Sequence, residues 1–249
     1  MLHPTQIAQF SARGYLALES VFSAGEIEEV RTLLDPLFQR LGSLPAALVN
    51  DLAGGRTDSQ PMRSPELNRP STLEPGLRQT RVYRRCLAMA AQIAGRHTKY
   101  VFDHAIYKSP RNAAPTPWHQ DHAYNGHRRL LRTVHFWIPL QPVTVESGCM
   151  HFVPRSHHSG LLRHERHAQG PALQVRRDDW SEAVPCPLRE GGVTLHTPLT
   201  LHFTGPNRSS GVRRAWILHF GPWGRWSKLH PSILLDKLSG RNPALDESR

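Results

Sequence analysis

Two stretches of the sequence decide the fold prediction: Trp118-His119-Gln120-Asp121 and, downstream, His202-Phe203-Thr204-Gly205-Pro206-Asn207. In an extended strand alternate side chains share a face, so His119 and Asp121 are expected to point the same way. One imidazole and one carboxylate on a single face supply two-thirds of a metal site. His202 is the best candidate for the third ligand. Two histidines and one carboxylate with open positions beside them are typical of non-haem Fe(II) oxygenases.

Two alternatives to this metal site remain open from the residues alone. The chain has 16 histidines, so a His-x-Asp pair can arise by chance. His196 also lies in a strand-like run and competes with His202 for the third position. The arginine downstream of His202, Arg213, begins another strand-like run and strengthens the metal hypothesis.

Length and composition predict a globular chain. Its 249 residues suffice for one large β-rich or mixed domain with a sizeable core. No run of about eighteen apolar residues occurs, so no membrane span is predicted. Residues 1–4 lack the pattern of a signal peptide. The 3 cysteines have no metal-ligand spacing and argue against a disulfide framework. The cytoplasm is therefore the expected location.

The formal net charge of +11 bears on partners. The arginines are scattered and no nucleic-acid-binding motif accompanies them, which argues against a nucleic-acid partner. A basic surface without a specific role is the favoured interpretation, and an anionic small-molecule substrate is the alternative. The sequence leaves the oligomeric state open between monomer and dimer.

The hydrophobic pattern divides the chain into three parts. Residues 1–98 are predicted to be mainly helical, with helices over 4–13, after a capping box at Ser23, and over 77–94. From residue 99 to 222 the period changes to two, and short strands separated by Gly and Pro are typical of a sandwich or jelly roll. Residues 223–249 are predicted to be a polar tail. Residues 43–76 and 154–179 show no periodicity and are expected to be irregular, mobile covers.

These segments resemble the phytanoyl-CoA dioxygenase family of Fe(II)- and 2-oxoglutarate-dependent oxygenases. The matching segments are residues 10–16, 118–121, 137–140, 146–150, 153–157 and 196–207, together with Arg213. The resemblance implies a single domain, mostly β with N-terminal helices, whose core is a double-stranded β-helix, that is, a cupin-like jelly roll.

By position, the resemblance also implies roles for particular residues. Fe(II) is expected to be bound by His119, Asp121 and His202, whereas the spacing of His196 to Arg213 is wrong for the family. Arg213 is expected to pair with the distal carboxylate of 2-oxoglutarate, because its planar guanidinium matches a carboxylate. The other residues expected at the 2-oxoglutarate site are Thr204, where the family commonly has serine, Trp137, Lys108 and Gln120.

Strand alternation alone does not decide which arginine faces the interior. It groups Arg213 with Ala215, Ile217 and His219, and it places Arg214 on the opposite face. Either face can be interior on this pattern. The resemblance implies that Arg213 is the arginine that faces the interior.

The implied function is that of an Fe(II)- and 2-oxoglutarate-dependent dioxygenase. With O2 it would hydroxylate, or otherwise oxidise, a C–H bond of a small organic substrate, either an anionic compound or a natural-product intermediate. Asp121 favours hydroxylation, because related halogenases replace this carboxylate. The alternatives are a non-enzymatic cupin-like binding protein and a zinc hydrolase. The sequence does not identify the substrate, and Tyr124, Asn125 and His127 are candidates for contacting it.

Overall fold

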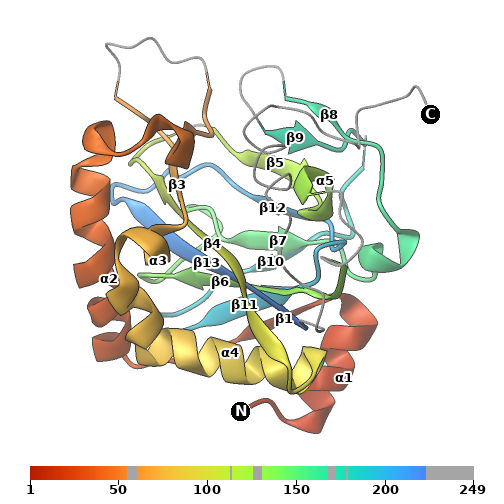
Figure 1. Ribbon diagram of the computed structural model, residues 1–249. Helices are drawn as coiled ribbons and strands as arrows, with labels where there is room; N and C mark the ends of the chain where they lie inside the picture. Colours follow the sequence, from red (N-terminus) through yellow and green to blue (C-terminus); the bar gives the residue numbers. More distant parts are fainter. Residues whose placement is uncertain (55–60, 113, 126–130, 168–171, 178, 223–249) are drawn as a thin grey trace.

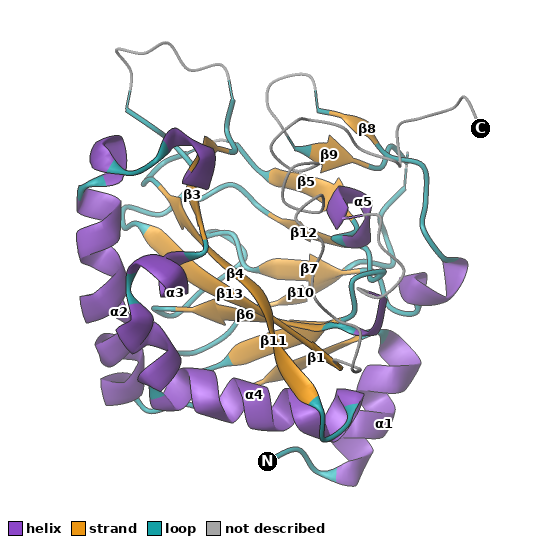
Figure 2. Ribbon diagram, viewed as in Figure 1, coloured by secondary structure: helices purple, strands orange, loops and turns teal. Residues whose placement is uncertain are grey.

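The computed structural model describes residues 1–54, 61–112, 114–125, 131–167, 172–177 and 179–222. Figure 1 shows a helical layer beside a large sheet, with a smaller sheet on the other side of it, and Figure 2 separates helices from strands by colour. The α-helices are α1 (Pro4–Arg13), α2 (Ala24–Gln39), α3 (Pro70–Leu73), α4 (Arg81–Ala94) and α5 (His122–Asn125). The 3₁₀ turns are η1 (Leu41–Ser43), η2 (Ala46–Leu48), η3 (Pro75–Gln79) and η5 (Ser156–Ser159). The expected mostly-β chain with N-terminal helices is confirmed.

The large sheet has seven strands in the order β1-β11-β6-β13-β4-β3-β2, with antiparallel neighbours. Its strands are β1 (Tyr15–Leu18), β2 (Val49–Asp51), β3 (Pro65–Asn68), β4 (Thr98–Lys108), β6 (Val134–Pro139), β11 (Val193–His196) and β13 (Arg213–Pro222). The small sheet has the order β10-β7-β12-β5 and is also antiparallel. Its strands are β5 (Thr116–His119), β7 (Met150–Phe152), β10 (Val184–Cys186) and β12 (His202–Thr204). A separate hairpin pairs β8 (Glu165–Arg166) with β9 (Leu173–Gln174).

The hydrophobic core has two layers because both faces of the large sheet are covered. On β13, Trp216, Leu218 and Phe220 belong to the cluster that packs against the helices. Ala215 and Ile217, on the other face, belong to the cluster shared with β7 and β10 of the small sheet. A strand that is buried on both faces reads as an almost continuous apolar run. This is why alternation could not decide the orientation of Arg213.

Local signals in the N-terminal part agree with the structure where helices begin and end. Ser23 and Glu26 form the expected reciprocal capping box of α2. Gly14 ends α1 with φ of +82°, the left-handed conformation that glycine adopts at little cost. A side chain would not fit there, because a Cβ would lie 2.4 Å from Nδ1 of His157.

Two expectations for the first hundred residues are wrong in part. Residues 43–76 are not irregular throughout, because β3 within them pairs with β4 and extends the large sheet, with Leu67 opposite Ala105. The predicted helix over 77–94 begins at Arg81 instead. Thr80 caps it by accepting a hydrogen bond from the Tyr83 amide, and the preceding residues form η3.

Several predictions concern the chain as a whole. Within the described ranges, no helix has both the length and the apolar character that a membrane crossing needs. The three cysteines are free and buried. The predicted tail, residues 223–249, lies outside the described residues. The division into three parts and the cytoplasmic location stay predictions.

Candidate metal and cosubstrate site

Two neighbouring strands of the small sheet, β5 and β12 (Figure 1), bring together the two histidines of a His-Asp-His group. His119, at the end of β5, is the register partner of His202, at the start of β12. Oδ1 of Asp121 lies 3.4 Å from Nε2 of His119 and 3.6 Å from Nε2 of His202. One ligand atom from each residue lies within 4.8 Å of the others. These three residues are therefore close enough to hold one metal ion.

Asp121 reaches this position from a turn and not from a strand. The strand ends at His119, and the next backbone N–H, that of Gln120, donates to Nε2 of His164 at 3.0 Å. Helix α5 begins directly after Asp121. The expectation that His119 and Asp121 share a face of one strand is therefore wrong in its reason, although the two side chains do meet.

The two histidines present the nitrogen that a metal needs. Nδ1 of His119 lies 2.7 Å from the carbonyl oxygen of Pro117, and Nδ1 of His202 lies 2.9 Å from that of Thr200. A carbonyl oxygen only accepts, so Nδ1 carries the proton in each ring and Nε2 keeps its lone pair. Burial, and then the neighbouring His119, hold the pKa of His202 well below its ordinary value. The ring is therefore a neutral donor at neutral pH.

The Asp121 carboxyl is ionised in this environment. Burial raises its pKa, but the electrostatic interaction with His202 and the hydrogen bonds from neighbouring imidazoles lower it by more. The result is a pKa well below the ordinary value of an aspartate. Two imidazoles and one carboxylate fit a divalent ion such as Fe(II).

Two cations lie buried together in the large sheet. Lys108 ends β4, Arg213 begins β13, and the two are register partners. Their exposed fractions are 0% and 2%. No carboxylate of the described residues forms an ion pair with either of them, and among those residues neither Nε nor Nη1 of Arg213 has a hydrogen-bond partner. Buried cations of this kind need an anionic partner, so the pair fits a carboxylate of 2-oxoglutarate.

Burial shifts the pKa values of both cations. It lowers the pKa of Arg213 to about 10. Burial, and then repulsion from Arg213, hold the pKa of Lys108 well below its ordinary value. Both shifts have the same sign, because burial without a counter-charge disfavours the protonated form.

Thr204 and Trp137 complete the surroundings of the cations. Nζ of Lys108 donates to Oγ1 of Thr204 at 3.0 Å and to the carbonyl oxygen of Gly205 at 2.9 Å. Because Oγ1 accepts this bond, the hydroxyl hydrogen of Thr204 is available to a bound anion. The buried ring of Trp137 has its centroid 5.5 Å from Cζ of Arg213 and forms an apolar wall beside it.

Gln120, expected near the cosubstrate, is engaged with the chain itself. Its amide nitrogen donates to the carbonyl oxygens of Gly160 at 2.8 Å and Leu199 at 2.7 Å. Its amide oxygen accepts from the Leu162 N–H at 2.8 Å. The side chain thus fastens the segment after η5 to the loop before β12.

Of the residues proposed to contact substrate, Tyr124 is the one that the structure describes in full. Its ring lies edge-on to His119, with centroids 5.6 Å apart, and its hydroxyl accepts from the Leu173 N–H at 2.8 Å. Tyr124 therefore lies beside the metal group. His127 lies outside the described residues, and the side chain of Asn125 does too.

A row of histidines on the inner face of the large sheet was not found from the sequence as a group. His196, His135 and His219 are register partners on the adjacent strands β11, β6 and β13. Each has an exposed fraction of 6% or less. His196, the rival third ligand, lies with Nε2 3.0 Å from Oδ2 of Asp121, whereas His119 and His202 lie toward Oδ1. Its ring is close to that of His202, with centroids 4.5 Å apart.

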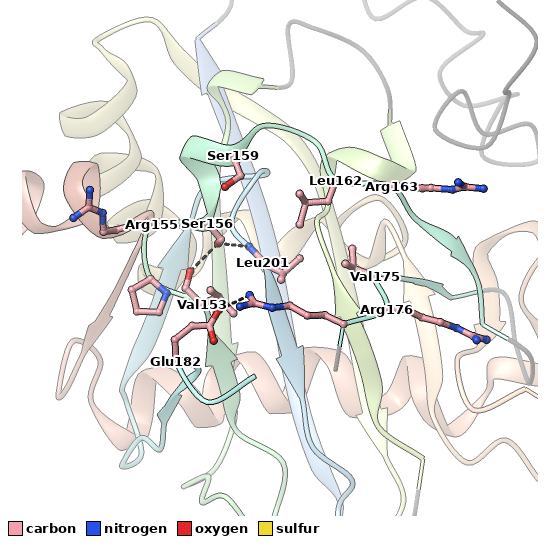
Figure 3. Close-up of a pocket in the computed structure, with 12 residues that line it drawn as sticks. Val153, Arg155, Ser156, Ser159, Leu162, Arg163, Val175, Arg176, Glu182 and Leu201 are labelled. Carbon is pink, nitrogen blue, oxygen red and sulfur yellow. Dashed lines mark hydrogen bonds and ion pairs between the residues drawn. The ribbon is translucent and has the colours of Figure 1, made fainter. Parts of the chain in front are cut away.

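A hollow of about 600 Å³ has none of His119, Asp121 and His202 in its lining (Figure 3). Most of its lining comes from residues 153–163 and 175–182, largely within the segment predicted to be a cover. In Figure 3 the side chains of Arg155, Arg163 and Arg176 extend away from the centre of this hollow. Arg177 forms an ion pair with Glu182. Because these guanidinium groups do not converge, the hollow is not a built anion site.

Two facing antiparallel sheets with a His-Asp-His group define a protein of the facial-triad metal class. Residues 10–215 match the phytanoyl-CoA dioxygenase family, and the chain belongs to that family. The resemblance drawn from the sequence is thereby confirmed. Fe(II), 2-oxoglutarate and O2, the expected cofactor and cosubstrates, are those of this family, and the residues present fit them.

Individual relatives give the range of similarity. Phytanoyl-CoA dioxygenase domain-containing protein 1 of Mus musculus is 31% identical over 121 residues, which cover 46% of this chain and 42% of the relative. That match therefore spans less than half of the mouse protein. A probable alpha-ketoglutarate-dependent hypophosphite dioxygenase of Stutzerimonas stutzeri is 26% identical over 237 residues, covering 90% of this chain and 80% of the relative.

Solved structures agree with the fold. EvdO2 from Micromonospora carbonacea var. aurantiaca, complexed with 2-oxoglutarate, is similar with a TM-score of 0.72 and 31% identity, over 88% of this chain and 91% of that one. The alpha-ketoglutarate-dependent carbocyclase SnoK from nogalamycin biosynthesis has a TM-score of 0.70 at 24% identity, over 88% and 83% of the two chains. This second likeness concerns the fold alone.

Proposed function

We propose that the chain is an Fe(II)- and 2-oxoglutarate-dependent oxygenase that oxidises a C–H bond of a small organic substrate, with hydroxylation as the expected outcome. The proposal assigns Fe(II) to His119, Asp121 and His202. It includes a double-stranded β-helix core, which two facing antiparallel sheets and the similar solved structures support. When bound, iron and 2-oxoglutarate supply the oxidising power.

One observation carries the proposal: the buried, register-paired cations Lys108 and Arg213, of which Lys108 is hydrogen-bonded to Thr204, two residues after His202 of the His-Asp-His group on the same strand. A binding protein that holds only a metal has no use for two buried cations. A zinc hydrolase would want a general base near the metal, which is a different requirement from two buried cations. A dicarboxylate cosubstrate whose near end lies at the metal and whose far end lies at the cations accounts for both features.

In this proposal the chain's own residues bind and orient 2-oxoglutarate, and they exclude water from its far end. The Arg213 fork and the Lys108 ammonium neutralise the far carboxylate, and the free hydroxyl hydrogen of Thr204 donates to it. The ring of Trp137 forms an apolar wall on one side of the pocket for this carboxylate. The carbonyls of Pro117 and Thr200 hold the two imidazoles in the tautomer that leaves Nε2 free.

The experiment that tests this function is an anaerobic titration. We expect Fe(II)-loaded protein to develop the metal-to-ligand charge-transfer band of 2-oxoglutarate bound to Fe(II). Aerobic incubation with a panel of small substrates should then form succinate above the level without substrate. If the wild-type protein binds Fe(II) but develops no band, the oxygenase hypothesis fails and the binding-protein hypothesis replaces it.

The cosubstrate affinity is predicted to depend on pH through Lys108. The pKa of free Lys108 is depressed, and a bound carboxylate favours the ammonium and raises it. Between these two pKa values binding takes up one proton, so the affinity falls as pH rises, by at most about tenfold per pH unit. Calorimetry in buffers of different ionisation enthalpy should measure this uptake.

Lys108→Met is the control for this pH effect. It should weaken 2-oxoglutarate binding and abolish the proton uptake. Arg213 stays protonated below its pKa of about 10, so it does not contribute to the proton uptake in that range. An equal uptake in the wild type and in Lys108→Met would contradict the assignment.

A further inference from the structure

The two carboxylate oxygens of Asp121 face different partners. Oδ1 lies toward Nε2 of His119 and His202, at 3.4 and 3.6 Å. Oδ2 lies 2.6 Å from Nδ1 of His135 and 3.0 Å from Nε2 of His196. The distances at Oδ2 are hydrogen-bond distances, and the two imidazoles are each 2% exposed.

The hydrogen bonds of His135 and His196 show which ring nitrogen of each donates to Oδ2. Nε2 of His135 lies 2.8 Å from the Thr133 hydroxyl, which can donate to it, so Nδ1–H of His135 donates to Oδ2. Nε2–H of His196 donates to the same oxygen. An ionised carboxylate oxygen has two lone pairs, and both lone pairs of Oδ2 are then engaged.

Resting on the proposed function, we infer that His135 and His196 are positioning residues that keep Asp121 a one-oxygen ligand. With Oδ2 held, the carboxylate offers Oδ1 alone to the metal. A metal with six positions and three protein donor atoms keeps three positions for 2-oxoglutarate and O2. A carboxylate bound through both oxygens would take one of them.

A second metal ion is the competing explanation, because Asp121, His135 and His219 also bring ligand atoms within 4.8 Å of one another. The rings of His135 and His219 argue against it. They stack with centroids 3.6 Å apart and an interplanar angle of 5°. A ring nitrogen binds a metal in its own ring plane at about 2.0–2.1 Å, so two stacked parallel rings cannot direct their lone pairs to one ion.

The test replaces the donors while keeping the packing. His135→Phe/His196→Phe removes both donors and retains flat rings. His135→Asn and His196→Gln return an N–H near the original nitrogen. His219→Phe is the matched control, because His219 stacks on His135 and has no hydrogen bond to Oδ2. Thermal unfolding verifies that each protein is folded.

Three readouts are used, none of which is turnover: Fe(II) affinity, metal stoichiometry and nitric oxide binding. Nitric oxide serves as a probe of the position for O2 and is followed by electron paramagnetic resonance of the Fe(II)- and 2-oxoglutarate-loaded protein. We expect the double Phe variant to bind Fe(II) about 10- to 100-fold more weakly, as for lost outer partners of metal ligands. Its nitric oxide affinity should fall by about tenfold or more, because the released Oδ2 would compete for the position that nitric oxide takes. The Asn and Gln variants and His219→Phe should behave like the wild type.

The positioning role, the single metal site and the proposed function are each contradicted by a different result. Unchanged Fe(II) and nitric oxide binding in the double Phe variant would overturn the positioning role. The same loss in His219→Phe would also overturn it, because packing would then be the cause. Two metal ions per chain, reduced to one by His219→Phe, would establish the second metal site instead. A wild-type protein that binds no Fe(II) would overturn the proposed function itself.

Discussion

The His202→Ala protein is expected to lose stoichiometric Fe(II) binding and all turnover. Only His119 and Asp121 would remain as ligands, and Oδ1 of Asp121 would have lost the imidazole 3.6 Å away. Loss of an outer partner typically costs 10–100-fold in metal affinity. Loss of one of three direct ligands should lower the Fe(II) affinity by more than about 100-fold. Anaerobic equilibrium dialysis with Fe(II) measures this.

His196→Ala is the matched comparison for His202→Ala. Both rings are buried, their centroids lie 4.5 Å apart, and both face Asp121. His196 faces Oδ2, however, so its variant should retain one Fe(II) per chain at reduced affinity. If His196→Ala lost the metal and His202→Ala kept it, the assignment of the third ligand would be wrong.

The second large effect is expected from Arg213→Ala. A bidentate arginine–carboxylate pair makes two charge-assisted hydrogen bonds, each contributing about 1.5–3 kcal/mol. Losing both should weaken 2-oxoglutarate binding by a factor of about 100 or more. Fe(II) affinity should hardly change, because the metal ligands belong to the other sheet or to the turn after β5. Titrating 2-oxoglutarate against the charge-transfer band separates the two affinities.

Arg214→Ala tests the adjacent residue on the opposite face of β13. Nε of Arg214 lies 3.0 Å from Oδ1 of Asp35, near the protein surface. Removing this half-buried ion pair should cost at most about 1 kcal/mol of stability and leave the 2-oxoglutarate affinity unchanged. A loss of cosubstrate affinity equal to that of Arg213→Ala would show that the two faces of the strand had been confused.

Much of the fold was predictable from local signals. The bounds of α1 agree with the predicted helix over 4–13, because a capping residue marks its start and Gly14 its end. Strand β3 was missed, because its segment is rich in Pro and Gly and its pairing partner, β4, lies about forty residues downstream. Long-range pairing of this kind leaves no local signal.

The candidate site was predictable in part, for a related reason. The metal and cosubstrate residues came from a resemblance that fixes positions, and the structure places most of them together. Gln120 shows the limit, since position in the chain did not reveal that its amide would bind the backbone at Gly160, Leu162 and Leu199. His135 was missed because every residue of β6 is buried, so neither face of that strand is marked by alternation.

If 2-oxoglutarate binds at Lys108 and Arg213 as proposed, its binding is also coupled to the folding equilibrium of the protein. The unfolded chain hydrates both cations freely, whereas the native core holds them side by side without a counter-charge from the described residues. A dicarboxylate that binds only the native state supplies this counter-charge. At about 100 times its dissociation constant such a ligand adds about 2.7 kcal/mol to the free energy of unfolding. On this proposal 2-oxoglutarate would stabilise the native state, and its depletion would shorten the lifetime of the protein as well as stop turnover.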